Sequence, residues 1–183
     1  MMDKKEIRQQ IKHQRLSLAE AQREKMSQQA CERLLPLLGG YQTVAFYSPI
    51  QGEINPRHAA EAFIASGGVA VYPRVEGDEM VMASGERTQG AFGIAEPTGM
   101  QVLGAVDAVV VPLLAADKQG NRLGWGKGYY DKYLQGKTCR KIGFCYDFQV
   151  IEAIDANAWD QPLDVIVTEK RTIIVSKEKE TKK

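Results

Sequence analysis

The sequence predicts a single α/β domain with a mostly parallel β-sheet flanked by helices. Two observations support this class. Residues 43–75 read as strand, helix and strand, with the apolar runs TVAFYS and VAVYPRV on either side of the helical segment PRHAAEAFIAS. Such a unit favours a parallel sheet with helical crossovers. The continuous β-branched run DAVVVPLL at 107–114 is typical of a central strand that is buried on both faces.

The remaining elements can be placed in order around this sheet. Ile7 and Ile11 lie one helical turn apart, and Ser17 with Glu20 has the spacing of a capping box, so residues 3–38 predict two helices joined near Ser17. Residues 76–104 alternate turn residues with short apolar pieces and indicate a meander. Farther along, YYDKYL predicts a short helix, and KIGFCY, DVIVT and TIIVS predict strands that complete the sheet.

Composition limits the class of protein and its surroundings. The chain has 183 residues, of which 44% are hydrophobic and 26% charged, so we expect one soluble domain over residues 1–176 and a disordered charged tail at 177–183. The net charge of +1 gives no bulk attraction for nucleic acid or for an anionic membrane. The three cysteines form no CxxC pair, as is typical of reduced thiols, and the N-terminus lacks a signal-peptide core. We therefore expect a cytoplasmic protein without nucleic-acid or membrane partners.

The stretch GNRLGWGKGYYDKYL at 120–134 is the strongest candidate for a site. Gly124, Gly126 and Gly128 alternate with Trp125 and Lys127, after a buried strand and before a helix. Ligands bind at such carboxyl ends of strands in open α/β sheets. Glycines let backbone N–H groups approach a ligand, and a helix start adds unpaired donors and partial positive charge. A phosphate group suits these features best, although a tight turn with close packing would give the same pattern.

Three side chains extend the phosphate hypothesis. The ammonium group of Lys127 and the planar fork of Arg122 can bind phosphoryl oxygens. Asp131 could hold Mg²⁺ that bridges those oxygens, although a carboxylate in the first turn of a helix is also favourable without a metal. No Ser or Thr follows Lys127, and the glycine spacing is GxGxG, so neither the P-loop nor the dinucleotide fingerprint is present. The residues favour a nucleotide-triphosphate site that matches neither familiar motif.

Six stretches spread over nearly the whole chain match one family. They are KKEIR, YSPIQGEIN, YPRV, FGIAEP, the long block VVPLLAADKQGNRLGWGKGYYD and LDVIVTE. In these stretches the chain resembles the 5-formyltetrahydrofolate cyclo-ligases, also called methenyltetrahydrofolate synthetases. The resemblance implies a Rossmann-type fold similar to sugar-phosphate isomerases and CoA transferases.

The resemblance also implies a reaction and its partners. ATP would phosphorylate the formyl oxygen of 5-formyltetrahydrofolate, and the neighbouring anilino nitrogen would attack the activated carbon. Phosphate would then leave as 5,10-methenyltetrahydrofolate forms. The implied partners are ATP, Mg²⁺ and the folate, with or without a polyglutamate tail. We expect a monomer or a weak homodimer.

The resemblance assigns roles to individual positions. Contacts with ATP are expected from Lys4, Lys5, Glu6, Ile7, Arg8, Arg74, Arg122, Leu123, Gly124, Trp125, Gly126, Lys127, Gly128, Tyr129 and Tyr130. Contacts with the folate are expected from Ser48, Glu53, Phe92, Gly126, Lys127, Gly128, Tyr129 and Tyr130. Lys127 and Arg122 are the expected catalytic groups, and Asp131 and Asp164 the expected magnesium ligands.

Residue chemistry agrees with these roles but leaves alternatives open. Glu53 can accept hydrogen bonds from pterin N–H groups, yet a glutamate in a loop is usually a solvent-exposed residue without a specific role. Lys4 and Arg8 share one helix face, which could equally be a solvated basic face. Asp164 could be a plain carboxylate at the start of a strand. The aromatic residues of the glycine stretch could pack against pterin or adenine, or belong to the core.

Two other functions remain open at this level. A sugar-phosphate isomerase or a CoA-transferase-like enzyme would bind a phosphate ligand on a similar fold without consuming ATP. A nucleotide-binding or RNA-binding module without turnover is suggested by the basic N-terminal helix, although the near-neutral net charge argues against it.

Phe92 stands where some family members have tryptophan, a difference expected to change substrate affinity rather than reaction type.

Overall fold

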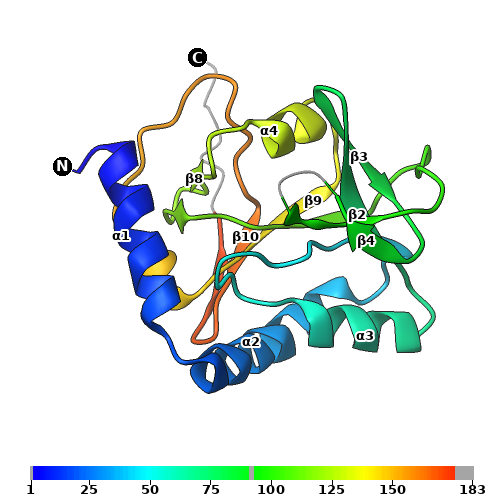
Figure 1. Ribbon diagram of the computed structural model, residues 1–183, viewed down its shortest axis with the longest axis horizontal. Coiled ribbons are helices and arrows are strands. Elements are labelled where there is room, and N and C mark those ends of the chain that lie inside the picture. The colour runs from blue at the N-terminus through cyan, green and yellow to red at the C-terminus, as the bar shows by residue number, and fades with distance from the viewer. Residues whose placement is uncertain (1, 91–92, 176–183) are drawn as a thin grey trace, which may run out of the picture.

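The computed structural model describes residues 2–90 and 93–175, and is built around a seven-stranded sheet with the strand order β11-β10-β9-β6-β1-β2-β3 (Figure 1). The parallel strands are β1 (Thr43–Ala45), β2 (Val69–Glu76), β6 (Ala108–Val111), β9 (Arg140–Phe144) and β10 (Val165–Val167). The edge strands β3 (Glu79–Ala83) and β11 (Thr172–Ile174) are antiparallel to their neighbours. The predicted α/β class with a mostly parallel sheet is confirmed.

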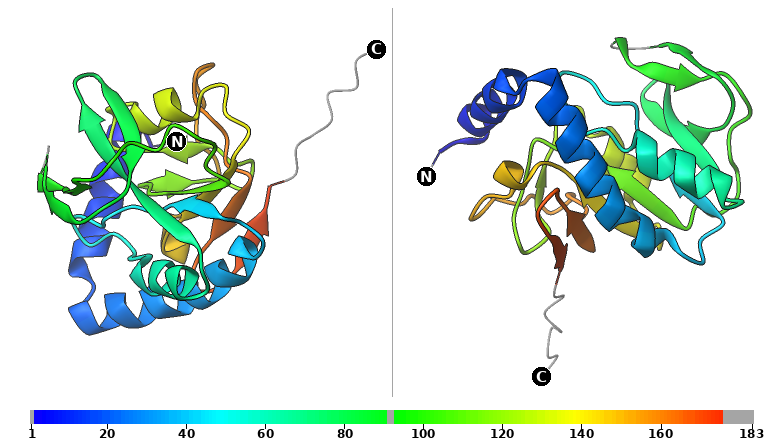
Figure 2. Two further views of the ribbon diagram at one scale, coloured as in Figure 1. Left: turned by 90° about the vertical axis from the view of Figure 1, so that its right-hand side faces the viewer. Right: turned by 90° about the horizontal axis from the view of Figure 1, so that it is seen from below.

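Helices cover both faces of this sheet. They are α1 (Lys4–Ser17), α2 (Glu20–Leu34), α3 (Arg57–Ala65) and α4 (Tyr129–Leu134), with the 3₁₀ turns η1 (Leu35–Leu38) and η3 (Asp147–Gln149). Helices α2 and α3 lie along one face, whereas α4 lies on the other, as Figures 1 and 2 show. Helix α1 stands apart from both layers and packs Ile7 and Ile11 against Leu114 and Leu123.

The central strand β6 shows why the sequence is apolar without interruption at this point. Ala108 and Val110 point into the core under α2 and α3, and Val109 and Val111 point into the core under α4. All four side chains are fully buried. Because successive side chains of a strand point to opposite faces, only a strand covered on both sides needs such a run.

The two N-terminal helices were predicted correctly, but the start of α2 was not. Ser17 is the last residue of α1, and its hydroxyl donates to the carbonyl of Gln14 at 2.7 Å. Helix α2 begins at Glu20, and the side chain of Gln22 reaches back to the N–H of Ala19 at 3.0 Å. The capping interaction therefore lies two residues beyond the predicted pair, because the chain is extended at Leu18.

Two short hairpins complete the described chain. The predicted meander contains β4 (Arg87–Gln89) paired with β5 (Ala95–Pro97), whereas β7 (Ala115–Ala116) and β8 (Arg122–Leu123) form a hairpin that was not predicted. The buried carboxylate of Asp117 closes that hairpin by accepting backbone N–H groups of its turn. In the described part of the chain, every helix is too short or too polar to cross a membrane. Phe92 and the tail 177–183 lie outside the described residues.

Candidate active site

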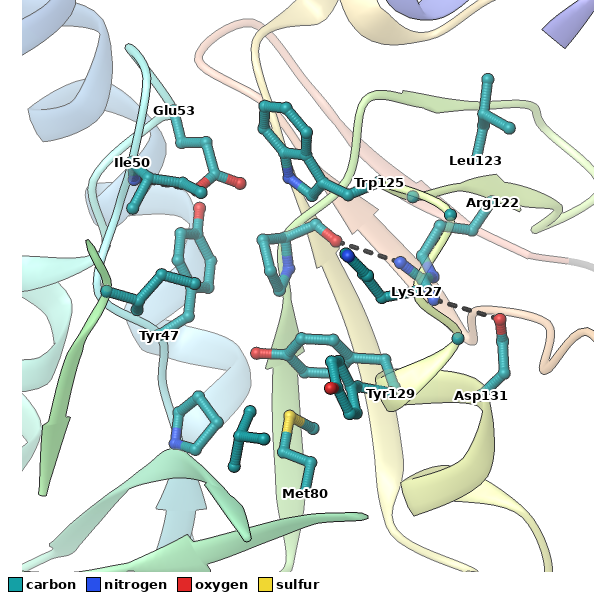
Figure 3. A pocket seen from close by; sticks show the side chains of 18 of the residues that line it. Tyr47, Ile50, Glu53, Met80, Arg122, Leu123, Trp125, Lys127, Tyr129 and Asp131 are labelled. Carbon is teal, nitrogen blue, oxygen red and sulfur yellow. Dashed lines mark hydrogen bonds and ion pairs between the residues drawn. The ribbon is translucent and has the colours of Figure 1, made fainter. Parts of the chain in front are cut away.

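A cleft with a volume of about 510 Å³ lies at the side of the sheet where β1 and β6 end. It is lined by helix α1, the segment after β1, the hairpin of β2 and β3, the glycine stretch and three shorter groups of residues. These groups are Ile94 with Glu96, Pro112, and Asn157 with Trp159 and Asp160. Figure 3 shows Glu53 beside Trp125 at one end of the cleft, Asp131 at another, and Lys127 extending into the space between. Residues from distant parts of the sequence therefore meet in one cavity.

The glycine stretch needs its glycines for space and for backbone conformation. A Cβ atom at position 124 would lie 2.7 Å from Nη1 of Arg122, which is closer than two such atoms can approach. Gly126 and Gly128 have φ angles of 97° and 73°, in the left-handed region that favours glycine. The carbonyl of Gly124 accepts a hydrogen bond of 2.9 Å from Nε of Arg8, so helix α1 fixes the position of the stretch.

Arg122 is a fixed part of the cleft wall. Its side chain is 7% exposed, forms an ion pair of 3.4 Å with Asp131 and donates to the carbonyl of Pro112 at 3.3 Å. Its guanidinium also lies 5.7 Å from the ring centroid of Tyr130. These contacts place a permanent positive charge beside the glycine stretch.

Asp131 is held from a second direction as well. Its Oδ1 atom accepts the backbone N–H of Gln161 at 3.0 Å, while Oδ2 faces Arg122. This bond brings the segment around residue 161 against the first turn of α4. No group of three or more His, Cys, Asp or Glu side chains that could hold a metal occurs in residues 2–90 and 93–175. A metal at Asp131 would therefore need most of its ligands from a bound substrate or from water.

Glu53 is the buried acid of the cleft. It is 8% exposed, and its Oε1 accepts the backbone N–H of Ile50 at 2.9 Å. Within the described residues its other oxygen, Oε2, has no hydrogen-bond partner. Burial raises the pKa of Glu53 to about 7, although the Ile50 N–H, the charge of Arg15 and the indole of Trp125 act in the opposite direction. A carboxyl group in this state suits a ligand that offers hydrogen-bond donors.

The aromatic residues of the glycine stretch contribute to both the cleft and the core. Tyr129 and Tyr130 line the cleft and also pack against the apolar cluster under α4. Burial raises the pKa of the Tyr130 hydroxyl. Trp125 faces Lys12 and Arg15 of α1, which lie 5.1 and 5.3 Å from its ring centroid. Both tyrosines therefore combine core packing with a place in the cleft wall, and their contact with a ligand stays a prediction.

Most of the predicted site residues lie in this cleft. Those that line it are Lys4, Arg8, Ser48, Glu53, Arg122, Leu123, Gly124, Trp125, Gly126, Lys127, Gly128, Tyr129, Tyr130 and Asp131. Lys5, Glu6, Ile7, Arg74 and Asp164 do not line it. Glu6 instead caps α1 through the N–H of Asp3, and Ile7 is part of the core beneath that helix.

Arg74 and Asp164 make structural contacts. Alternation along β2 sends Pro73 and Val75 into the cleft and Arg74 to the other face, where it donates to the carbonyls of Pro97 and Gly99. Asp164 accepts the backbone N–H of Lys141 at 2.9 Å, just before β10 begins. Its role as a magnesium ligand remains a prediction.

Sequence reasoning missed part of the cleft. Tyr47, Gln51 and Met80 line it, as do Asn157, Trp159 and Asp160 from the segment before β10. Trp159 is 68% exposed, which is unusual for so large an aromatic side chain. The sequence does contain one signal, because this tryptophan stands in the polar segment NAWDQP rather than in an apolar run.

The fold and the cleft define a class of protein. It is an α/β protein with one cleft, lined by cationic side chains and a glycine-rich backbone stretch on one side and by a buried carboxyl group on another. Such a cleft can hold an anion near one wall and a hydrogen-bond donor near another. A family model described as the 5-formyltetrahydrofolate cyclo-ligase family matches residues 1–169. The chain belongs to this family of ligases, as the resemblance in its sequence predicted.

Individual relatives agree with this assignment. The 5-formyltetrahydrofolate cyclo-ligase of Mycoplasma pneumoniae is 31% identical over 175 residues, which cover 92% of this chain and 100% of the relative. The Escherichia coli (strain K12) cyclo-ligase is 29% identical, over 86% of this chain and 96% of the relative. The solved structure of Aquifex aeolicus 5,10-methenyltetrahydrofolate synthetase has a TM-score of 0.85 and 36% identity, covering 100% of this chain and 97% of that one. Family membership implies an ATP-dependent ligase with ATP and 5-formyltetrahydrofolate as substrates.

Proposed function

We propose that this protein converts 5-formyltetrahydrofolate to 5,10-methenyltetrahydrofolate with the cleavage of one ATP to ADP and phosphate, assisted by Mg²⁺. The formyl oxygen takes the γ-phosphoryl group, and the anilino nitrogen attacks the activated carbon and loses its proton. The carbon–oxygen bond then breaks and phosphate leaves. The observation that carries the proposal is that one cleft contains both the Lys127 loop and the buried Glu53.

The glycine stretch and α1 supply the charge that a triphosphate needs. Lys4, Arg8 and Lys127 line the cleft, and Arg122 lies in its wall. Phosphoryl transfer depends mainly on positioning and on neutralising the charge of the phosphoryl oxygens. In the proposed reaction, Lys127 binds the transferred phosphoryl group, and Arg122 acts from a fixed position beside Asp131.

The other end of the cleft supplies the contact with the pterin. The unpartnered Oε2 of Glu53 is a buried acceptor, and the amino and ring N–H groups of a reduced pterin are donors. Binding such donors favours the ionised carboxylate, so the folate would draw the pKa of Glu53 down from its value of about 7 in the free protein. Trp125, beside Glu53 in Figure 3, offers a ring face to the same ligand.

Magnesium fits the cleft only as a companion of the nucleotide. Asp131 is the carboxylate in the first turn of α4, next to the glycine stretch, and Mg²⁺ is commonly held by one or two carboxylates together with substrate phosphates. The bound ion would neutralise charge on the phosphoryl oxygens. Asp131 would hold it while Gln161 and Arg122 keep the carboxylate in place.

The proposed reaction uses no covalent protein nucleophile. None of the three cysteines lines the cleft. Burial raises the pKa of Cys31 to about 11, so its thiol stays protonated at neutral pH. The protein is therefore expected to act by bringing two substrates together rather than by forming a covalent bond to either of them.

The proposal is tested by following the absorbance change as 5-formyltetrahydrofolate becomes the methenyl product. ATP and Mg²⁺ are each supplied or withheld, and phosphate release is measured in parallel. We expect product only when all components are present, with one phosphate released per methenyl group formed. Phosphate release that does not depend on the folate would contradict the proposed function, and binding of ATP without turnover would favour a nucleotide-binding module.

A further inference from the structure

A fully buried arginine lies behind the cleft and has no role in the proposed chemistry. Arg15, in the last turn of α1, is 0% exposed. Its Nη2 atom donates to the carbonyl of Gln51 at 3.2 Å, while Nε and Nη1 have no partner within the described residues. A buried cation with one hydrogen bond is costly to retain, so its other contacts need an explanation.

Arg15 joins two walls of the cleft. Through Gln51 it holds the segment between β1 and α3 that carries Glu53. Its guanidinium carbon also lies 5.3 Å from the ring centroid of Trp125, within range of a cation–π interaction. The folate-binding carboxylate and the indole beside it are therefore both supported by the same side chain.

The segment held by Arg15 is strained. Among the described residues other than glycine, Gln51 alone has a positive φ, of 46°. Such a conformation persists only when surrounding contacts hold it. The bond from Arg15 to the Gln51 carbonyl is one such contact, and the bond of 3.0 Å from the Tyr146 hydroxyl to the Gly52 carbonyl is another. The turn that follows directs Glu53 into the cleft.

Arg15 also acts on Glu53 by its charge. The charge of Arg15 opposes the effect of burial and lowers the pKa of Glu53. The other titratable groups that interact with this carboxyl group include Tyr47 after β1 and Tyr130 on α4, both of which are neutral at ordinary pH because burial raises the pKa of each hydroxyl. Arg15 is therefore the cation that favours ionised Glu53 from behind the cleft.

We propose that Arg15 is a positioning residue for folate recognition, which orients Glu53 and Trp125 without touching the substrate. The inference rests on the proposed function in one respect, the role of Glu53 in binding the pterin. Lys12 provides a matched control, because its ammonium also faces Trp125, at 5.1 Å, whereas the hydrogen bond to the Gln51 carbonyl comes from Arg15.

The experiment compares Arg15→Met, Arg15→Lys and Lys12→Met. For Arg15→Met we expect the KM for 5-formyltetrahydrofolate to rise about tenfold, with the KM for ATP within about twofold of the unchanged protein. In the pH profile of kcat/KM for the folate, the acidic limb should shift to higher pH by about one unit, because loss of the cation raises the pKa of Glu53. Arg15→Lys should keep this acidic limb in place and still raise the KM for the folate. Lys12→Met, which removes only a contact with Trp125, should keep the limb in place and raise the KM for the folate less than Arg15→Met does.

A second measurement does not depend on turnover. The pKa of the Glu53 carboxyl group is followed by carbon-13 NMR in the protein without substrates, and we expect it to rise in Arg15→Met only. An unchanged pKa in a folded Arg15→Met protein would overturn the inference, as would equal effects on the two KM values. If Arg15→Met does not fold, an unchanged folate KM in Arg15→Lys would overturn it. Absence of turnover in the unchanged protein would count against the proposed function. The effect of Arg15 on Glu53 would then be judged from the NMR titration alone.

Discussion

The guanidinium of Arg122 and the carboxylate of Asp131 lie 3.4 Å apart, so the ion pair ties β8 to the first turn of α4 across the whole glycine run. The two side chains are 7% and 20% exposed, so the pair is largely shielded from solvent. Because Arg122 is fixed and Asp131 is held by Gln161, the stretch between them has both ends anchored.

Changing Asp131→Asn tests both roles of this carboxylate. We expect a loss of about 1 to 3 kcal/mol in the free energy of unfolding, because Arg122 is left without its counter-charge. We also expect a higher Mg²⁺ concentration for half-maximal activity. Urea unfolding and a magnesium titration of turnover measure the two effects. A lower stability with an unchanged magnesium requirement would mean that Asp131 only holds Arg122.

Changing Lys127→Ala should lower kcat by about tenfold or more, because the transferred phosphoryl group loses a cation that acts in the transition state. The rate is measured with both substrates saturating. Lys132→Ala is the matched control, since Lys132 lies on α4, is exposed and does not line the cleft. Equal rates for the two variants would show that the phosphates bind elsewhere.

Changing Glu53→Gln should impair use of the folate more than binding of ATP. The amide keeps the size of the side chain but cannot carry the charge that favours pterin N–H donors. We expect the KM for the folate to rise at least about tenfold while the KM for ATP stays within about twofold. Glu32→Gln on the exposed face of α2 controls for the loss of one negative charge. Similar damage to both KM values in a folded protein would argue against the assigned role.

Glu53→Gln is also expected to change how the stability of the protein depends on pH. The pKa of Glu53 in the folded protein, about 7, lies above its ordinary value of 4.5. Between these values the folded protein binds more protons than the unfolded chain, so this group makes the protein less stable as the pH rises from about 4.5 to 7. Glu53→Gln removes the effect. We expect it to stabilise the protein by about 1 to 3 kcal/mol at pH 8 and little at pH 4, measured by urea unfolding.

Tryptophan fluorescence can locate the two substrates, because the chain has two tryptophans and both line the cleft. In Trp159→Phe only Trp125 reports, and it lies beside Glu53. We expect the folate to change its emission strongly and ADP to change it weakly. Trp125→Phe leaves Trp159, whose segment is tied to Asp131 through Gln161, so ADP should have the larger effect. If ADP changed the emission of Trp125 more strongly and the folate changed that of Trp159 more strongly, the proposed positions of the two substrates would be reversed.

Much of the fold could be predicted because it depends on local patterns. The β-branched run of β6 and the strand–helix–strand unit of β1, α3 and β2 each reflect burial that leaves a direct trace in the sequence. The start of α2 was misplaced because Ala19 has no side-chain signal for a cap and Ser17 has a strong one. The β7–β8 hairpin was missed because its two strands are only two residues each.

The site could be predicted where one stretch carries the chemistry. Gly124, Gly126 and Lys127 lie within four consecutive residues, so the sequence itself indicates that they line one cavity. Trp159 and Arg15 could not be assigned, because their place beside the cleft depends on how segments far from the glycine stretch pack against it. Arg74 was predicted to contact ATP, but the alternation along β2 sends its side chain away from the cleft while its neighbours enter it, so that role stays a prediction.

The parallel pairing of β1 with β6 has a consequence for synthesis of the chain on the ribosome. Val44 pairs with Ala108, and the cleft needs residues as distant as Lys4 and Asp160. The N-terminal helices and β1 are synthesised before the wall that carries Asn157 and Asp160. Because such a cleft forms only when segments distant in the sequence have packed together, a ligand that needs all of its walls binds after the sheet has formed and cannot guide the first folding steps.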